Sequence, residues 1–253
     1  MPAPRKAMLS RLTKLNFAAK QIQLPTQWRQ PGNQYPDAFS PRERMVAPTP
    51  PLNLFREATL NKYHVDSART IGKQFEKYID GVSGAICKGI GEWMRTATVV
   101  GVVIGGPVGV VRPGCVLGPP LMPLILKSAP KKTPQEQKYS RAIAGAFGSA
   151  WQGWHLGVTG VMAFPGLPMA PCPNVPMPLI ALPSVGEALL SPKALQASMM
   201  AQLGEPTALH APALFDAIAQ SFFITFQTFK ATTLVMNVIG TVAVGNGPPG
   251  CIR

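Results

Sequence analysis

The stretch Ala142-Ile143-Ala144-Gly145-Ala146-Phe147-Gly148-Ser149-Ala150-Trp151-Gln152-Gly153-Trp154 recurs, in altered form, later in the chain as Ala217-Ile218-Ala219-Gln220-Ser221-Phe222-Phe223-Ile224-Thr225-Phe226-Gln227-Thr228-Phe229. Ala, Ile, Ala, Phe and Gln return in register, and both Trp positions become Phe. A weaker copy lies upstream, where Trp93 matches Trp154. A long period that is present in only three copies predicts pseudo-threefold symmetry rather than a solenoid.

A Gly/Pro-rich apolar segment with one cysteine follows each copy. The two outer copies keep a constant offset, so that Trp93 falls on Phe229 and Pro113-Gly114-Cys115-Val116 falls on Pro249-Gly250-Cys251-Ile252. Cys172 is the cysteine of the middle segment, and a second echo, Met-Pro-Leu-Ile, begins at Met122 and again at Met177. We therefore expect the three cysteines to occupy equivalent places beside Pro/Gly turns.

Each repeat is predicted to hold a helix followed by a short strand, which makes the fold class α+β. Thr133, Pro134 and Glu136 form a strong helix start, with a cap, a proline at the first helical position and a capping box. Runs of Val and Ile after the helices favour strands. The expected helices cover 66–95, 133–155, 192–202 and the segment from 212 into 232–238, and the expected strand runs cover 99–104, 158–164 and 235–244.

The chain is predicted to divide into an N-terminal arm and a triplicated core. Many prolines and an excess of Lys and Arg mark residues 1–64 as an extended basic arm with one short, weakly amphipathic helix near Leu9–Gln23. An arm of this kind is expected to contact other chains more than its own core. The core, residues 65–253, is expected to hold repeats at 65–127, 128–183 and 205–253, with an accessory helix at 184–204.

The charge pattern bears on the partners. The formal net charge is +13, which suits an acidic protein, an anionic lipid or a nucleic acid, but no nucleic-acid-binding signature accompanies it. Residues 142–186 and 231–252 hold no Lys, Arg, Asp or Glu, yet prolines interrupt both runs, and irregular backbone is not tolerated facing lipid. Burial against other protein subunits therefore explains these runs better than a membrane span. No apolar signal segment follows Met1, so we expect synthesis in the cytosol.

No catalytic motif is found, and the expectation is a protein that is not an enzyme. His64, His155 and His210 are scattered along the chain, and nothing pairs them with an activated nucleophile. If the repeats surround a common axis, Cys115, Cys172 and Cys251 could converge there, and three thiolates with a histidine would suit zinc or iron. The alternative is that the three cysteines are small packing residues beside similar turns.

The stretch Cys172-Pro173-Asn174-Val175-Pro176-Met177-Pro178 resembles the Cys/Pro/Asn-rich stretch of PAAR and PAAR-like proteins, although the Pro-Ala-Ala-Arg signature itself is absent. Those proteins tip the spikes of contractile injection systems and phage-type tails, fold as pseudo-threefold cones and can hold a metal near the apex. The resemblance implies a structural subunit in the spike or baseplate of such a machine, on a threefold-symmetric partner. A membrane-active protein and a basic nucleic-acid-packaging protein remain as alternatives.

Overall fold

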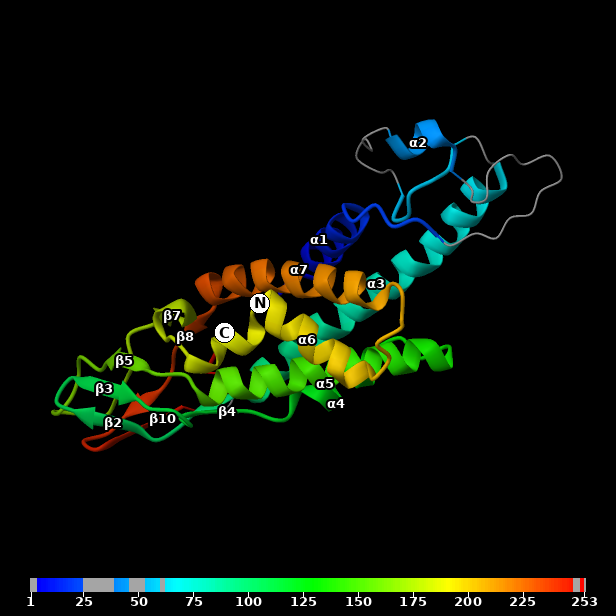
Figure 1. Ribbon diagram of the computed structural model, residues 1–253. Helices are drawn as coiled ribbons and strands as arrows, with labels where there is room; N and C mark the ends of the chain where they lie inside the picture. The colour runs from blue at the N-terminus through cyan, green and yellow to red at the C-terminus, as the bar shows by residue number, and fades with distance from the viewer. Residues whose placement is uncertain (1–3, 25–38, 46–52, 60–61, 248–250, 253) are drawn as a thin grey trace.

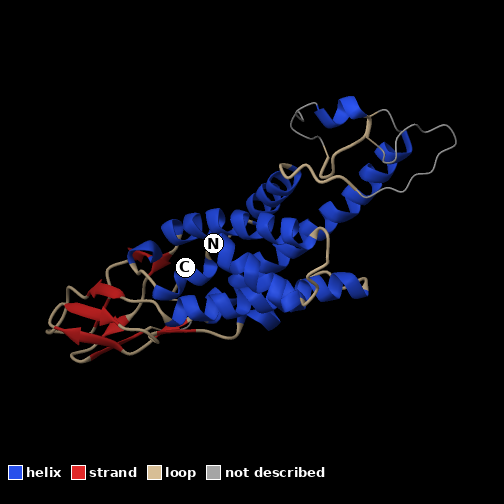
Figure 2. Cartoon of the chain, in the orientation of Figure 1, coloured by secondary structure: helices blue, strands red, loops and turns tan. Residues whose placement is uncertain are grey.

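The structure is a computed structural model that describes residues 4–24, 39–45, 53–59, 62–247 and 251–252. Its class is α+β, as the sequence predicted. Helices form an elongated bundle, and short antiparallel strands gather at one end of it (Figure 1, Figure 2). The long helix α3 extends beyond the bundle at the opposite end and carries the short helix α2 there (Figure 1).

Three long helices correspond to the three copies of the repeated stretch: α3 (Lys62–Thr96), α5 (Pro134–Leu156) and α7 (Ala211–Thr232). Each was expected, and α5 and α7 begin near the predicted residues, but α3 begins at Lys62, before the expected start at residue 66. The Thr133 hydroxyl accepts a hydrogen bond from Glu136 N at 3.1 Å, and the Glu136 carboxylate accepts one from Lys132 N at 2.6 Å. These bonds satisfy donors that a helix start leaves without intrahelical partners.

Shorter helices pack around these three. The accessory helix α6 begins at the expected proline and ends at Gly204, which adopts φ 66°. The segment α4 was not expected, because Pro123 lies inside it and masks the helical pattern. The remaining elements are α1 (Lys6–Ala18), α2 (Pro41–Met45), α4 (Leu121–Ser128), α6 (Pro192–Leu203) and the 3-10 turns η1 (Leu179–Ala181) and η2 (Val185–Leu190).

Helix α1 corrects the expectation of an extended arm. It lies against α3 and α7, and Leu9 and Phe17 are fully buried there. Asn16 Nδ2 donates to Ser221 Oγ at 3.0 Å, and Lys14 forms an ion pair with Asp80 at 2.9 Å. Residues 6–18 therefore belong to the core, because their apolar side is large enough to outweigh the cost of ordering them. Much of the rest of the expected arm, including residues 25–38 and 46–52, lies outside the described residues.

The strands form hairpins that follow the C-terminal ends of the three long helices. The main sheet has the order β5-β3-β2-β10-β9-β6, with every neighbouring pair antiparallel. Two small pairs, β1 with β4 and β7 with β8, lie between this sheet and the helices. The strands are β1 (Thr98–Val99), β2 (Val102–Gly105), β3 (Val108–Val111), β4 (Val116–Leu117), β5 (Gly160–Ala163), β6 (Cys172–Pro173), β7 (Met177–Pro178), β8 (Leu234–Val235), β9 (Ile239–Gly240) and β10 (Val244–Asn246).

The three hairpins have the same internal register. Each pairs a residue of its first strand with a residue of its own returning segment: Val103 with Val110, Ala163 with Val175, and Ile239 with Asn246. In the middle hairpin the link is a single hydrogen bond of 2.9 Å from Val175 N to Ala163 O. That bond also joins the two ends of the strand order, since Ala163 ends β5 and Val175 follows β6 shortly afterwards.

The contacts between hairpins follow one register as well. The same three first-strand residues pair with the second strand of a neighbouring hairpin: Val103 with Val244, Ala163 with Val108, and Ile239 with Pro173. The first strands β2 and β9 therefore have a strand partner on both sides, and β5 has β3 on one side and the bond from Val175 on the other. The expected strand runs were longer, but turns interrupt them, at Gly101 with φ 69° in the first run and after Gly240 in the third.

The two outer units also match at their bases. Val100 N donates to Cys115 O at 2.8 Å, and the corresponding bond from Met236 N to Cys251 O is 3.0 Å. Gly101 adopts φ 69°, and its counterpart Asn237 adopts φ 64°. The constant offset between the outer copies in the sequence is thus repeated in hydrogen bonds and backbone angles. The Met-Pro-Leu-Ile echo is not repeated in this way, because its first copy lies in α4 and its second in β7 and η1.

Candidate functional site

The most distinctive surface of the protein is the set of three hairpins, which we name the hairpin tip: residues 102–111, 160–175 and 239–246. None of these residues is Asp, Glu, Lys, Arg or His. The tip lies beyond the helical bundle (Figure 1). Cys172 is the one residue of the tip with a titratable side chain. Another molecule would therefore meet a mainly apolar surface here.

The outward side of the tip is covered by exposed aliphatic side chains. The strand patterns alternate, so that Val102 and Ile104 are buried while Val103 is 41% exposed. The exposed set includes Val103, Val108, Val110, Val161, Met169, Val175, Ile239, Val242 and Val244. Exposed apolar surface of this extent marks an interaction site in most soluble proteins. The alternation of small and branched residues in 102–111 is the sequence signal that could have located this surface.

The inside of the tip is filled by one aromatic ring. Phe164 is fully buried, and glycines face it: a Cβ built on Gly109 would lie 2.6 Å from its Cε2 atom, and one built on Gly240 would lie 2.6 Å from its Cδ1 atom. Asn174 is 3% exposed, and its side chain bonds the backbone of Val238 and Val235 at 3.0 and 3.1 Å. The interior is therefore tightly packed, and its buried Asn174 amide is satisfied.

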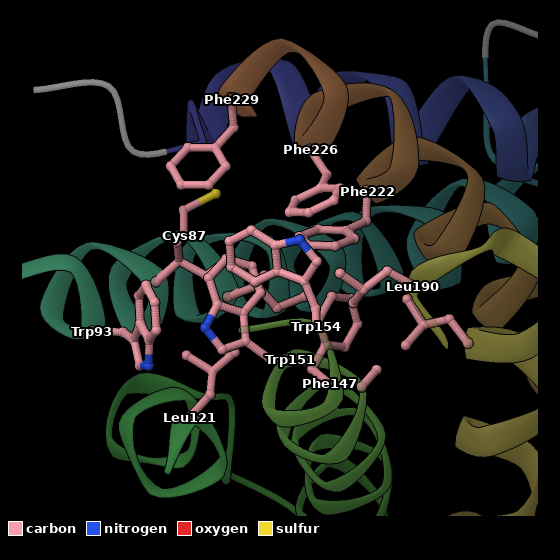
Figure 3. Close-up of a cluster of buried hydrophobic side chains, with 14 of the residues drawn as sticks. Cys87, Trp93, Leu121, Phe147, Trp151, Trp154, Leu190, Phe222, Phe226 and Phe229 are labelled. Atoms are coloured by element: carbon pink, nitrogen blue, oxygen red, sulfur yellow. The ribbon is translucent and has the colours of Figure 1, made fainter. Parts of the chain in front are cut away.

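An aromatic cluster lies among the long helices α3, α5 and α7 (Figure 3). Trp93 and Trp151 meet edge to face with ring centroids 5.2 Å apart, as do Trp154 and Phe226 at 5.2 Å. Phe229 closes the cluster 6.2 Å from Trp151. Trp93, Trp154 and Phe229, which the repeat places in register, are thus buried in one cluster, and such aromatic pairs add to the free energy gained from burial alone.

Two of the three cysteines occupy matching positions. The Cys115 thiol lies 3.5 Å from Gly101 O, and the Cys251 thiol lies 3.7 Å from Asn237 O. Cys172 differs, because it is half-buried in β6 and pairs with Gly240. The loop between the strands of the middle hairpin is longer than the turn of the first hairpin, which displaces its cysteine from the expected place.

The expected metal site is not assembled by these residues. Within the described ranges, no group of three or more His, Cys, Asp and Glu side chains lies close enough to hold a metal ion. The expectation of zinc or iron at Cys115, Cys172 and Cys251 therefore has no support from the geometry. The two matching cysteines instead pack beside backbone carbonyls, which was the alternative reading of the sequence.

The histidines stay apart from one another. His155 Nδ1 lies 3.0 Å from Val116 O, and burial lowers the pKa of His155 below its ordinary value despite that bond. Burial likewise lowers the pKa values of His64 and His210, which lie at α3 and before α7. Each imidazole therefore favours its neutral form and is a packing group in its own region.

A partly buried ion pair lies where α7 approaches the tip, since the Glu187 side chain is 27% exposed. The Lys230 side chain is 7% exposed, and its Nζ atom donates to the Glu187 carboxylate at 2.5 Å. Gln227 Nε2 donates to the same oxygen at 3.0 Å, and Lys230 Nζ lies 5.2 Å from the centroid of the Phe226 ring. Sequence reasoning missed this pair, since the two residues are far apart in the chain and nothing local relates them.

None of the described helices is both long enough and apolar enough to cross a bilayer. Comparison with known proteins adds no relative: no protein-family model matches the chain, and neither a curated protein nor a solved structure resembles it significantly.

Proposed function

We propose that this chain is a non-enzymatic structural subunit that sits on a threefold axis of a large assembly, of the kind found in the spike or baseplate of a phage-tail-like contractile injection machine. The observation that carries the proposal is the common register of the three hairpins, within each hairpin and between neighbours. One register used three times is expected if three similar units are arranged around one axis.

A chain built from three similar units can bind a threefold-symmetric partner as a monomer. A monomer placed on the axis of a homotrimer faces three identical surfaces, and it can contact all three equally only if it presents a similar surface three times. The long helices α3, α5 and α7 and their hairpins supply three such units. The units also differ, for example in the longer middle hairpin, so some contacts with the partner would not follow threefold symmetry.

The character of the hairpin tip favours a structural role over catalysis. Acid–base catalysis uses positioned titratable groups, and the tip contains the thiol of Cys172 but no Asp, Glu, Lys, Arg or His. His64 and His155 are buried in different regions of the described chain, and His210, at the start of α7, is half-buried. The resemblance of residues 172–178 to spike-tip proteins also favours a structural role, as a rigid domain at the end of a spike.

Imaging of the assembled protein tests the proposal. The full chain, tagged at its N-terminus and produced in its native cells, should sediment with a large particle, and electron micrographs of that particle should place the tag on a threefold axis. Recovery of the chain only as a free protein of 27.0 kDa would contradict the proposal.

A further inference from the structure

The outer face of the hairpin tip has the chemistry of a surface that enters lipid. We infer that the tip inserts shallowly into an anionic bilayer surface, with the ends of the hairpins in the acyl region and the base of the tip at the headgroups. This inference uses the same surface as the proposed function but does not depend on the threefold assembly.

The first step in the argument is the continuity of apolar character around the tip. Exposed aliphatic side chains come from all three hairpins, for example Val110, Val175 and Ile239, so the apolar surface is not confined to one side. The end of the third hairpin presents Val242, which is 71% exposed, and the middle loop presents Met169, which is 96% exposed. Exposed apolar patches mark protein or membrane contact sites, and lipid can surround the tip on all of its sides.

The second step concerns the backbone. An apolar medium offers no partners for free N–H and C=O groups, so a sheet that enters it needs its strands paired on both sides. In the tip β2 and β9 are paired on both sides, and β5 is paired with β3 on one side and accepts a single hydrogen bond from Val175 N on the other. Asn174, a buried side-chain amide, is satisfied as well. The paired strands therefore lose few hydrogen bonds with water on entering an apolar phase, and the irregular loop 164–171 limits the insertion to a shallow one.

The third step is the charge at the base of the tip. Arg95 lies in the last turn of α3, Arg112 directly follows β3, and both are exposed. A four-residue strand spans about 13 Å, so Arg112 lies roughly one strand length from the end of the first hairpin, and Arg95, at the end of α3, lies farther from it. Cationic side chains at that depth meet anionic headgroups while the aliphatic residues lie below them. No acidic residue occurs in the tip to oppose this arrangement.

Flotation with vesicles tests the inference on the full chain. We expect the protein to float with vesicles of phosphatidylcholine and phosphatidylglycerol in equal parts, and to float less with phosphatidylcholine alone. The double variant Val110→Glu/Val242→Glu should lower the bound fraction about tenfold, because each carboxylate would have to leave water. Arg112→Gln should lower binding to the anionic vesicles by about fivefold and leave binding to phosphatidylcholine vesicles unchanged. Added salt should also lower binding to the anionic vesicles.

Leu209→Glu provides the matched control. Leu209 is 78% exposed, but it precedes the start of α7, whereas the tip follows the end of α7. This variant should float as the unmodified chain does, and circular dichroism should show that all variants melt at similar temperatures. Equal flotation of the tip variant and the unmodified chain would overturn the inference. So would a failure of the unmodified chain to float; if that chain still enters a particle, the tip is a protein–protein contact and the proposed function stands.

Discussion

Phe164 occupies the space that Gly240 leaves open, since a Cβ atom built on Gly240 would lie 2.6 Å from Cδ1 of the Phe164 ring. The two residues hold the same place in their hairpins, because each directly follows the first-strand residue that pairs on both sides, Ala163 or Ile239. Ile104 holds that place in the first hairpin. The centre of the tip is therefore shared by the large ring of Phe164, the medium-sized side chain of Ile104 and Gly240, which has no side chain.

The first prediction concerns this complementary packing. Phe164→Gly should cost about 3–5 kcal/mol by leaving a cavity, and Gly240→Phe should cost at least about 1–3 kcal/mol by overpacking. The double variant that exchanges the two residues should be more stable than the sum of the single effects predicts, because the ring returns to the same centre from an equivalent position. Urea unfolding of the four proteins measures this. Strictly additive losses would show that the two positions are not interchangeable.

The second prediction compares two residues in the left-handed region. Gly101 and Asn237 adopt φ 69° and 64°, and no atom lies within 4 Å of a Cβ built on Gly101. Gly101→Ala should therefore cost about 1–2 kcal/mol through backbone strain alone. Asn237→Gly, the matched change in the other outer unit, should leave the free energy of unfolding unchanged or raise it by less than about 1 kcal/mol. A tolerated alanine at 101 would count against the shared backbone conformation.

Sequence patterns located the helices well, because helix signals are local. The cap, proline and glutamate at 133–136 predicted the start of α5, and Gly204 predicted the end of α6. The hairpins could not be derived in the same way. Their strands are short, and some of their partners lie in distant parts of the chain, as with Val103 and Val244. A short apolar run does not specify which distant run will pair with it.

The candidate site was partly visible in the sequence. The uncharged segments indicated a surface or core of unusual composition, but their exposure depends on which residues the pairing turns outward. The sequence predicted equivalent positions for three cysteines. Cys115 and Cys251 do occupy equivalent positions, but Cys172 does not, because the longer middle hairpin displaces it. The sequence did not predict that α1 packs into the core. Its few apolar residues are buried against α3 and α7, and no local pattern indicates that contact.

The third prediction concerns the ion pair between Lys230 and Glu187. Glu187→Ala should cost about 3 kcal/mol, because it leaves the ammonium group of Lys230, which is 7% exposed, without its carboxylate. Replacing both partners, as in Glu187→Leu/Lys230→Met, should recover most of this loss, since apolar residues of similar volume remove the buried charge altogether. Thermal unfolding of the two variants measures the difference. A double variant as unstable as Glu187→Ala would show that the pair itself is required.

The fourth prediction concerns pH. Burial lowers the pKa values of His64, His155 and His210 in the folded chain, so the unfolded chain binds more protons just below the ordinary histidine pKa. Stability should therefore be complete above about pH 7.5 and should fall as the pH decreases through about 6.5 toward about 5. Burial acts to raise the pKa of Asp80, but its bonds from Ser10 and Lys14 bring it below the ordinary value, so its effect appears only in more acidic solution.

The variant His155→Gln separates one histidine from the other two. It cannot titrate in this range, so the decrease in unfolding free energy between about pH 7.5 and about pH 5 should be smaller than in the unmodified chain. Guanidinium unfolding at the two pH values provides the measurement. An unchanged decrease would mean that His155 is not protonated on unfolding in this range.

The last prediction tests whether α1 belongs to the core. Phe17 is fully buried, and its ring contacts Phe55 and Phe75 with centroids 5.6 and 5.0 Å apart, whereas Leu15 on the same helix is 57% exposed. Phe17→Ala should cost about 3–5 kcal/mol, and Leu15→Ala should change the free energy of unfolding by no more than about 0.5 kcal/mol. Urea unfolding of the two single variants gives both values under one set of conditions. Similar small effects at both positions would mean that residues 6–18 rest loosely on the bundle, as the basic arm predicted from the sequence would do.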